Sequence, residues 1–448
     1  MLMNYYILKE LKIKYLTLVI ASFSTGIGVA QNIDFPNSRL IKLEEALQLG
    51  IQNNKQLKMA TTDVAIANEN LSQSKIAKAP RIGLNAGYNY IGNPKIYEGF
   101  YERSITVDYF NNQSFGNIVG SMPIYNGGAI NDRINQQQLI SNMKESVVKM
   151  TESEIKLAIV QQYFTLEKLY RQIEVTKQNI INTDLRIKQL QSRVSNGQNL
   201  KSDLLRTELQ QSRFKVSVFQ DSNNIKLVSN YLDILIGLPT DTVLKSEVSE
   251  AMIPAEAINL EESLVEAYKN RVEIKQSELG VQLSESSLSL TKSGFKPNVN
   301  AKFILNSQYP AQWPNYPNIL NYWAAGVSLN WDISSFYNLK HRVSANKFEI
   351  EKSNIALENT KDQIDKELKT VFVRFVESKE NIITFKKDVE LSLSNYKIVK
   401  SRYDNDFALI SDMVDAELQV NAAKISLINA NLDLIIQYYS LQYAMGKL

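Results

Sequence analysis

The stretch ALISDMVDAELQ, residues 408–419, repeats NLKSDLLRTELQ, residues 199–210, at a distance of 209 positions. Six of the twelve aligned positions are identical, and only the second copy places Asp412 and Asp415 one helical turn apart. Self-similarity at a long fixed distance is typical of an internal duplication. We therefore interpret the chain as two homologous halves.

A second register supports the duplication. LEEALQLGIQNNKQLKMA, residues 43–60, aligns with LEESLVEAYKNRVEIKQS, residues 260–277, at an offset of 217, which also carries Pro80 onto Pro297. The offset of 209 also carries Gly237 onto Gly446. The two offsets differ by eight, so one connection, after Pro80, changed its length while the helical parts kept their register.

Each half is predicted to contain a helix, two strands, a long helix and a final helix, which makes the fold class mainly α with a β part. The first repeat spans residues 31–238, a linker spans 239–259, and the second repeat spans 260–448. The predicted elements of the first repeat are a helix at 43–79, a β-hairpin at 80–125, a long helix at 126–195 and a helix at 198–237. Those of the second repeat are a helix at 260–296, a β-hairpin at 297–333, a long helix at 334–403 and a helix at 407–446.

The predicted strands alternate between apolar and polar residues. RIGLNAGYNY, residues 81–90, is the clearest of four such strands. About 9 to 11 tilted residues cross a membrane as a strand, whereas a soluble hairpin packed on helices would also alternate. The membrane alternative is favoured by aromatic residues at the strand ends and loops, as in an interfacial girdle: Tyr88, Tyr90, Tyr97, Phe100, Tyr101, Tyr309, Trp313, Tyr316, Tyr322 and Trp323. Four strands cannot close a barrel, so we expect the chain to oligomerise.

The long helices carry a strict seven-residue apolar spacing, which predicts helices that pack side by side along their length. In the first half the spacing is carried by Ile159, Leu166, Ile173, Ile180, Ile187 and Val194, and in the second by Leu368, Phe375, Ile382, Val389, Tyr396 and Tyr403. At 1.5 Å per residue, helix 126–195 would be about 105 Å long, and helices 43–79 and 198–237 together about 115 Å. Two shorter helices stacked end to end therefore match one long helix.

The composition limits the function. The chain has 448 residues, a net charge of +3 and no cysteine, which gives no reason to expect a nucleic-acid partner and excludes disulfides and thiolate metal sites. Residues 1–30 resemble a cleaved signal peptide, with three lysines, an apolar run from Leu16 to Val29 and the small residues Gly28-Val29-Ala30 before the expected first mature residue, Gln31. A single membrane anchor is the alternative, but the apolar run is short for one.

No enzyme is predicted, and neither a cofactor nor a metal site. The single histidine, His341, cannot by itself supply a catalytic triad or a usual zinc site. Gly127-Gly128 ends a strand and opens a helix, but no Lys-Ser/Thr follows it, so we interpret the pair as a bend and not as a phosphate loop.

The duplicated halves, the LEEAL and LEESL starts, Pro80 and Pro297 at the helix-to-strand joins, and PIYNGG at 123–128 resemble the TolC family of outer-membrane efflux proteins over essentially the whole mature chain. The resemblance implies a homotrimer, with twelve strands forming one transmembrane β-barrel in outer-membrane lipid and twelve helices forming a periplasmic α-barrel. It also implies an entrance at the helix tips.

At that entrance the resemblance assigns residues. Asp412 and Asp415 match the family's lining aspartates, and Tyr403 and Asp203 match a Tyr–Asp bond that holds the entrance shut, with Ser202 beside them. The resemblance also implies an Arg five residues after the Tyr, but this chain has Ala408, so it lacks the charged part of that contact. From the residues alone, two acids at a helix start are more often a solvated helix terminus.

The function that the resemblance implies is the outer-membrane channel of a tripartite efflux system. It would be a passive conduit for small molecules that works with a periplasmic adaptor (membrane fusion) protein and an inner-membrane pump such as an RND transporter. The outer-membrane duct of a type I protein-secretion system is an alternative that the sequence does not separate. A periplasmic coiled-coil adaptor or scaffold is an alternative of another class, but it would not need lipid-facing strands.

Overall fold

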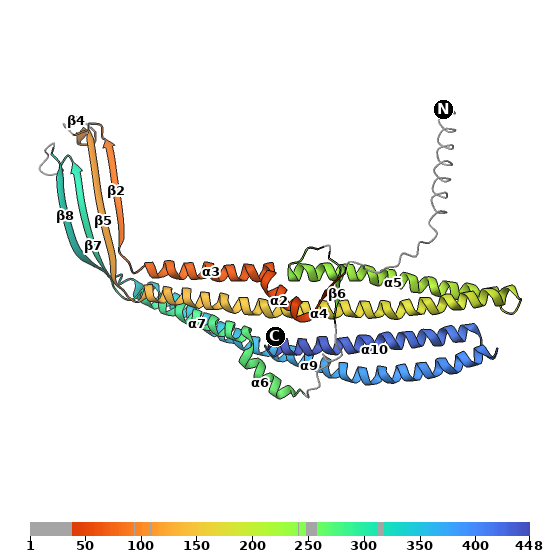
Figure 1. Cartoon of the computed structure of the whole chain (residues 1–448). Coiled ribbons are helices and arrows are strands. Elements are labelled where there is room, and N and C mark those ends of the chain that lie inside the picture. Colours follow the sequence, from red (N-terminus) through yellow and green to blue (C-terminus); the bar gives the residue numbers. More distant parts are fainter. Residues whose placement is uncertain are drawn as a thin grey trace, which may run out of the picture.

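The molecule is elongated, with a sheet at one end and long helices running to the other (Figure 1). The computed structural model describes residues 38–93, 95–101, 103–106, 110–240, 242–247, 258–311 and 318–448. The predicted signal peptide at 1–30 lies outside the described residues, as do Trp313 and Tyr316.

Both halves contain helices in the same order. The first half has α2 (Leu43–Asn53), α3 (Lys55–Ile76), α4 (Ala129–Ser195) and α5 (Lys201–Ile236). The second has α6 (Leu260–Asn270), α7 (Val272–Ser293), α8 (Ser335–Asn338), α9 (Lys340–Asp404) and α10 (Ile410–Ala444). None of the described helices has a stretch that is long and apolar enough to cross a membrane.

The predicted single helices at 43–79 and 260–296 are wrong, because each is two helices that break at the same place in the duplication. Asn54 leaves helical geometry, and its side chain accepts hydrogen bonds from the backbone N–H groups of Gln56 and Leu57, which caps α3. Its amide also donates to the Leu235 carbonyl at the end of α5, at 2.9 Å. The break at Asn54 therefore supplies a hydrogen-bond donor for a carbonyl group at the C-terminal end of α5.

Arg271 makes the equivalent break in the second half. Its guanidinium donates to both carboxylate oxygens of Glu273 at 2.8 and 2.9 Å, to Glu367 of α9 at 2.8 Å, and to the Ala444 carbonyl at the end of α10 at 3.4 Å. The predicted helix at 334–403 also differs, since it begins as the short α8 before α9.

Four strands form one antiparallel sheet in the order β2-β5-β7-β8. They are β2 (Arg81–Tyr90), β5 (Asn112–Asn126), β7 (Asn298–Tyr309) and β8 (Leu320–Asn330). The connection between β2 and β5 holds a further hairpin, β3 (Lys95–Glu98) with β4 (Arg103–Thr106), which the predicted hairpin at 80–125 did not include. This extra hairpin accounts for the greater length of the first half.

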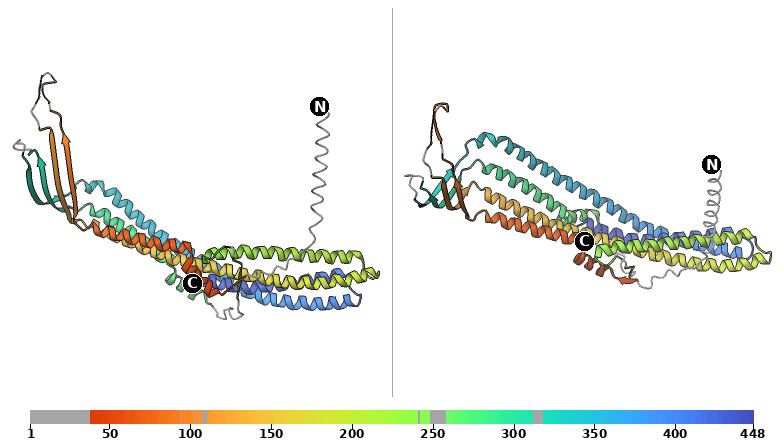
Figure 2. Two further views of the ribbon diagram at one scale, coloured as in Figure 1. Left: turned by 45° about the horizontal axis from the view of Figure 1, so that its top comes forward. Right: turned by 90° about the horizontal axis from the view of Figure 1, so that it is seen from above.

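The helices and the strands share one lateral order. α4 packs between α3 and α5 on one side and α7 and α10 on the other, and α9 packs against α7 and α10. Seen from above in Figure 2, α3, α4, α7 and α9 lie side by side in that sequence. Since α3 leads into β2 and β8 leads towards α9, the same two ends of the layer are open in the helices and in the sheet.

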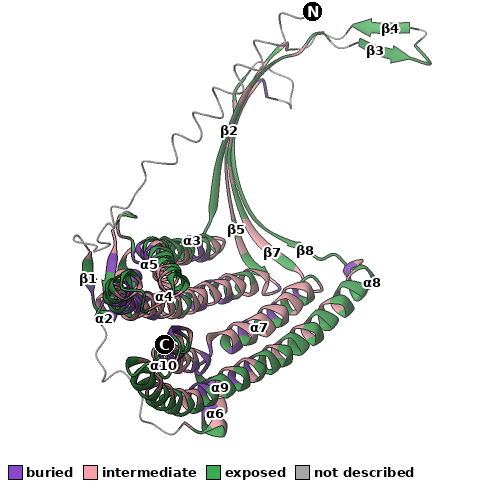
Figure 3. Ribbon diagram, turned by 90° about the vertical axis from the view of Figure 1, so that its right-hand side faces the viewer, coloured by how far each residue is buried: buried purple, intermediate pink, exposed green. Residues whose placement is uncertain are grey.

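The main core lies where α2 meets α4 and α5, near the middle of the molecule. Here β1 (Arg39–Ile41) pairs in parallel with β6 (Leu244–Ser246). The buried Tyr163 of α4 donates to the Glu247 carbonyl at 2.9 Å, and its hydroxyl accepts from the Glu247 N–H. Figure 3 shows buried residues gathering in the helices, whereas the four long strands contain none. The hydrophobic core of the protomer therefore lies in its helical part.

Candidate functional site

Two helical hairpins end together at the tip farthest from the sheet (Figure 1). The α4–α5 hairpin turns through Gly197, whose φ of 73° suits glycine, and the α9–α10 hairpin turns through Asp406 at φ 62°. An ion pair of 3.2 Å between Arg193 and Asp406 joins the two tips. Both copies of the repeated stretch begin just after these turns.

Asp412 and Asp415 are both exposed on the first turns of α10. The Asp412 carboxylate accepts from the Leu409 backbone N–H at 3.3 Å, so this acid helps to cap its own helix. On the other side of the helix, Met413 and Val414 are buried in a cluster with Leu190 of α4. The structure therefore directs the two carboxylates away from the packed interior of the protomer.

The other predicted gate residues lie close to the same tip but serve different contacts. Tyr403 packs against the cluster that contains Met413 and Val414, whereas Ser202 is exposed and Asp203 is half-buried in the first turn of α5. In the described part of this single chain, no hydrogen bond joins the side chains of Tyr403 and Asp203. A bond between two copies of the chain stays a prediction.

A polar row on α4 faces the second hairpin, and sequence analysis did not find it. Its members follow a seven-residue spacing and are Gln172, Asn179, Arg186 and Arg193. The Gln172 amide donates to the Asn429 side-chain oxygen at 3.0 Å, and Arg193 reaches Asp406. Towards the tip, polar contacts therefore join the two hairpins beside the apolar seam.

The buried member of this row is an ion pair between Arg186 of α4 and Glu417 of α10. The two charged groups are 2.6 Å apart, and each side chain is only 10% exposed. The neighbouring Tyr396 has its phenol pKa raised, first by burial and then by the negative charge of Glu417. A buried charge that loses its partner is costly, so this contact strongly disfavours separation of the hairpins.

Sequence signals for the polar row existed. Arg186 precedes Ile187 of the apolar heptad by one position, and Glu417 lies in the repeated ELQ motif. A seven-residue count of polar residues on α4, made in the same way as the apolar count, finds the row. Pairing it with α10 needs the antiparallel arrangement that only the fold supplies.

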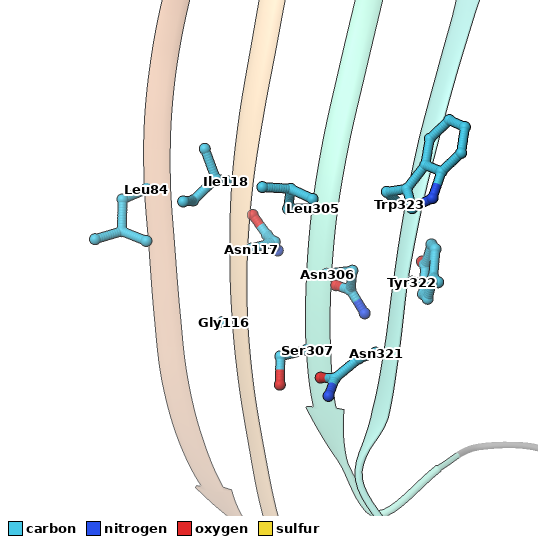
Figure 4. Close-up of a pocket in the computed structure, with 10 residues that line it drawn as sticks. All are labelled: Leu84, Gly116, Asn117, Ile118, Leu305, Asn306, Ser307, Asn321, Tyr322 and Trp323. Carbon is cyan, nitrogen blue, oxygen red and sulfur yellow. The ribbon is translucent and has the colours of Figure 1, made fainter.

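At the other end of the molecule, the register of the sheet places an apolar row and the adjacent polar row on opposite faces. Leu84, Ile118, Leu305 and Trp323 stand opposite one another across the four strands, as the residues labelled in Figure 4 indicate. Cross-strand neighbours point to the same face. One face therefore carries a continuous apolar row.

The adjacent row is polar. It contains Asn85, Asn117, Asn306 and Tyr322, and the Asn85 amide donates to the Asn117 side-chain oxygen at 3.0 Å. Neither outer edge of this sheet, along β2 and along β8, is paired within the described part of the chain. The sheet thus has an apolar row on one face, a polar row on the other and two open edges.

Apolar side chains are also exposed on the helices at the two ends of the layer. On α5 they include Leu209, Val216, Phe219, Leu227 and Ile234, and on α9 they include Phe348, Ile355, Ile383, Leu391 and Ile398. Long apolar seams of this kind are normally covered by a partner.

Comparisons with known proteins agree with this architecture. A family model described as outer membrane efflux protein matches residues 46–238 and 264–447. The fold is similar to that of the outer-membrane channel OprN, with 15% identity, 91% of this chain and 90% of that chain covered, and a TM-score of 0.76. It is also similar to the outer membrane protein VceC from Vibrio cholerae (15% identity, 90% and 96% covered, TM-score 0.74) and to the CmeC outer membrane channel of Campylobacter jejuni (14%, 90% and 85%, 0.73). A sequence comparison with curated proteins found no match.

Proposed function

The chain belongs to the outer membrane efflux protein family, and from this premise we propose that three copies close around one bore. Their twelve strands would form a barrel across the outer membrane, and their helices would continue it as a periplasmic duct. Family membership confirms the predicted class of function, an outer-membrane efflux protein, and makes a periplasmic scaffold without membrane strands the wrong alternative.

One observation carries the proposal, namely that the sheet and the helical layer are open at the same two ends. The free edges β2 and β8 would leave backbone groups unpaired in lipid, which is very costly. In a closed ring, β2 of one copy would pair with β8 of the next. The same rotation would bring the exposed seam of α5 against that of α9.

The tip is proposed as the gated entrance of this duct. Asp412 and Asp415 would project as stacked carboxylates that attract cations and repel anions at a constriction. Tyr403, Asp203 and Ser202 would contribute contacts between neighbouring hairpins. The Arg186–Glu417 and Arg193–Asp406 pairs support a closed resting arrangement within each copy.

The proposed partners follow from this arrangement. A passive duct provides neither energy nor selection of cargo, so we assign these to an inner-membrane pump, with a periplasmic adaptor bound at the helices. No catalytic activity is assigned to the chain. OprN and CmeC are described as outer-membrane channels, which supports this assignment without identifying the cargo.

Assembly is tested first, by native mass spectrometry of the detergent-extracted protein. A trimer is expected, and a stable monomer would reject the ring. The entrance is tested by planar-bilayer recording of the variant with Asp412→Asn and Asp415→Asn. Cation selectivity and block by multivalent cations should fall, whereas Asp388→Asn, an exposed acid of α9 away from the tip, should leave both unchanged. Unaltered selectivity in the double variant would rule out these acids as the lining.

A further inference from the structure

The segment between β8 and α9, residues 331–339, exposes apolar side chains at the junction of the sheet and the helices. Val327 and Leu329 lie on the apolar face of β8, and the same alternation continues to Trp331 and Ile333. Trp331 is 48% and Ile333 69% exposed. Exposed apolar side chains therefore continue past the last paired residue of β8.

Three rings hold this segment in place. The Trp331 indole N–H donates to the Phe295 carbonyl at 3.0 Å, and its ring meets that of Phe336 edge-on at 6.2 Å. The Phe336 ring also lies 5.6 Å from that of Phe295. Phe336 and Tyr337 of α8 nevertheless remain 55% and 70% exposed. The aromatic surface is thus ordered but only partly covered.

The duplication shows that the Trp331–Phe336 ring pair belongs to the second half alone, although the first half also exposes Met122, Ile124 and Tyr125 at the same junction. Trp331 and Phe336 align with Met122 and Gly127 of the first half. Gly127 has a φ of 67°, and a side chain there would meet the Ser293 carbonyl oxygen at 2.6 Å. The first half therefore makes a tight bend where the second half displays rings.

Positive charge surrounds the rings. Residues 292–296 and 331–347 contain five Lys and Arg residues and one acid, Asp332. The cations are Lys292, Lys296, Lys340, Arg342 and Lys347, and none forms an ion pair within the described residues. Asp332 accepts from the backbone N–H of Ser334 at 3.0 Å. Leu339 N–H donates to the Ser335 carbonyl, so the helical path continues and places Lys340 one turn after Phe336 on the same face.

We propose that residues 331–340 with Lys292 and Phe295, here called the interfacial foot, bind anionic phospholipid headgroups in the periplasmic leaflet of the outer membrane. This rests on the proposed membrane position of the sheet. Trp and Tyr rings, here those of Trp331 and Tyr337, favour the headgroup level. The Lys292 and Lys340 ammonium groups, which form no ion pair within the described residues, attract lipid phosphates. With three copies, three such feet would fix the depth of the duct and the direction of its helices.

Depth is tested by tryptophan quenching in vesicles. Trp331 is made the sole tryptophan by Trp313→Phe and Trp323→Phe, and the protein is reconstituted in phosphatidylcholine brominated either near the top or near the end of the acyl chain. Trp331 should be quenched more by the shallow bromines. The reference carries Trp331→Phe and Val327→Trp in the same background, which moves the indole about 13 Å along the strand, and it should favour the deep bromines.

Headgroup choice is tested with brominated phosphatidylglycerol against brominated phosphatidylcholine at low salt. Quenching of Trp331 should be stronger with the anionic lipid. In the variant with Lys292→Gln and Lys340→Gln, the preference for phosphatidylglycerol over phosphatidylcholine should fall roughly five-fold for each lysine replaced. Lys386→Gln, about 69 Å farther along α9 at 1.5 Å per residue, should lose none. Equal quenching by both lipids, or an unchanged preference in the double variant, overturns the proposal.

The lipid contact of the interfacial foot and the membrane position of the sheet predict different quenching results. If the indole at position 327 is quenched and Trp331 is not, the sheet lies in the bilayer and only the foot is wrong. If neither is quenched, the membrane position of the sheet fails, and the foot fails with it.

Discussion

The buried Arg186–Glu417 pair should hold the two hairpins of one protomer together. Glu417→Gln keeps the size of the side chain but leaves Arg186 without a countercharge at a position only 10% exposed. Breaking a buried pair in this way costs about 3–5 kcal/mol. Because Gln can still accept a hydrogen bond, we take about 3 kcal/mol, which corresponds to a shift on the order of 100-fold between joined and separated hairpins.

Single-channel recording in planar bilayers measures this shift as the ratio of open to closed time. Glu417→Gln should raise the ratio on the order of 100-fold if the pair exists only in the closed arrangement. Arg186→Gln combined with Glu417→Gln should lie between the wild type and the single variant, because no charge is then left unpaired. Glu208→Gln is the matched control, since Glu208 is the duplicate of Glu417 and forms no ion pair in the described part of the chain.

An open-to-closed ratio for Glu417→Gln within a few-fold of the wild type would show that the pair does not distinguish the two states. An equal rise in Glu208→Gln would refute the reasoning in another way. The effect would then follow from negative charge near the tip in general, and the contact between α4 and α10 would have no special part in it.

Two further predictions concern the middle of the molecule. Asp233 is fully buried, and burial raises its pKa from 3.8 to about 6, against smaller lowering effects of Thr242 and Arg39. Since the folded state holds this proton more tightly, stability should fall by about 2 kcal/mol as pH rises from 4 to 6, and thermal melts of Asp233→Asn should lose that dependence. Arg271→Met should lower the melting temperature by removing the contacts to Glu273 and Glu367. Because these two acids are 25% and 37% exposed, water screens them and the cost is about 1–2 kcal/mol; an unchanged melt would refute the role of this clamp.

The strands were predictable from sequence because alternation has a period of two. Leu84 could be assigned to an apolar face from its own strand alone, but its place in one row with Ile118 and Leu305 needed the register that only the fold supplies. The long helices were predictable for a similar reason, since the heptad from Ile159 onwards is buried or half-buried along α4. Periodic patterns of this kind can be recognised in a segment without knowing which other elements pack against it.

The helix breaks at Asn54 and Arg271 were not predicted, because they depend on a distant partner. Asn54 is a good N-cap residue, but no Gly or Pro lies within three residues of it. Its hydrogen-bond partner, the Leu235 carbonyl, is 181 residues away in sequence. Arg271 depends on Glu367 and Ala444 in the same way. Long-range contacts decided these positions, and local propensity did not.

The difference between the two copies of the repeated stretch has a physical consequence at the tip. Asp412 is the duplicate of Asp203, whereas Asp415 is the duplicate of Arg206. In the proposed ring both kinds of hairpin would alternate, so the level of Asp412 would be acidic in every hairpin and the level of Asp415 would alternate in sign. Opposite charges at close range reduce the field in the bore, so Asp412→Asn alone should lower cation selectivity in planar bilayers more than Asp415→Asn alone. The reverse order would mean that the α4–α5 hairpins lie outside the constriction and that the second copy alone forms it.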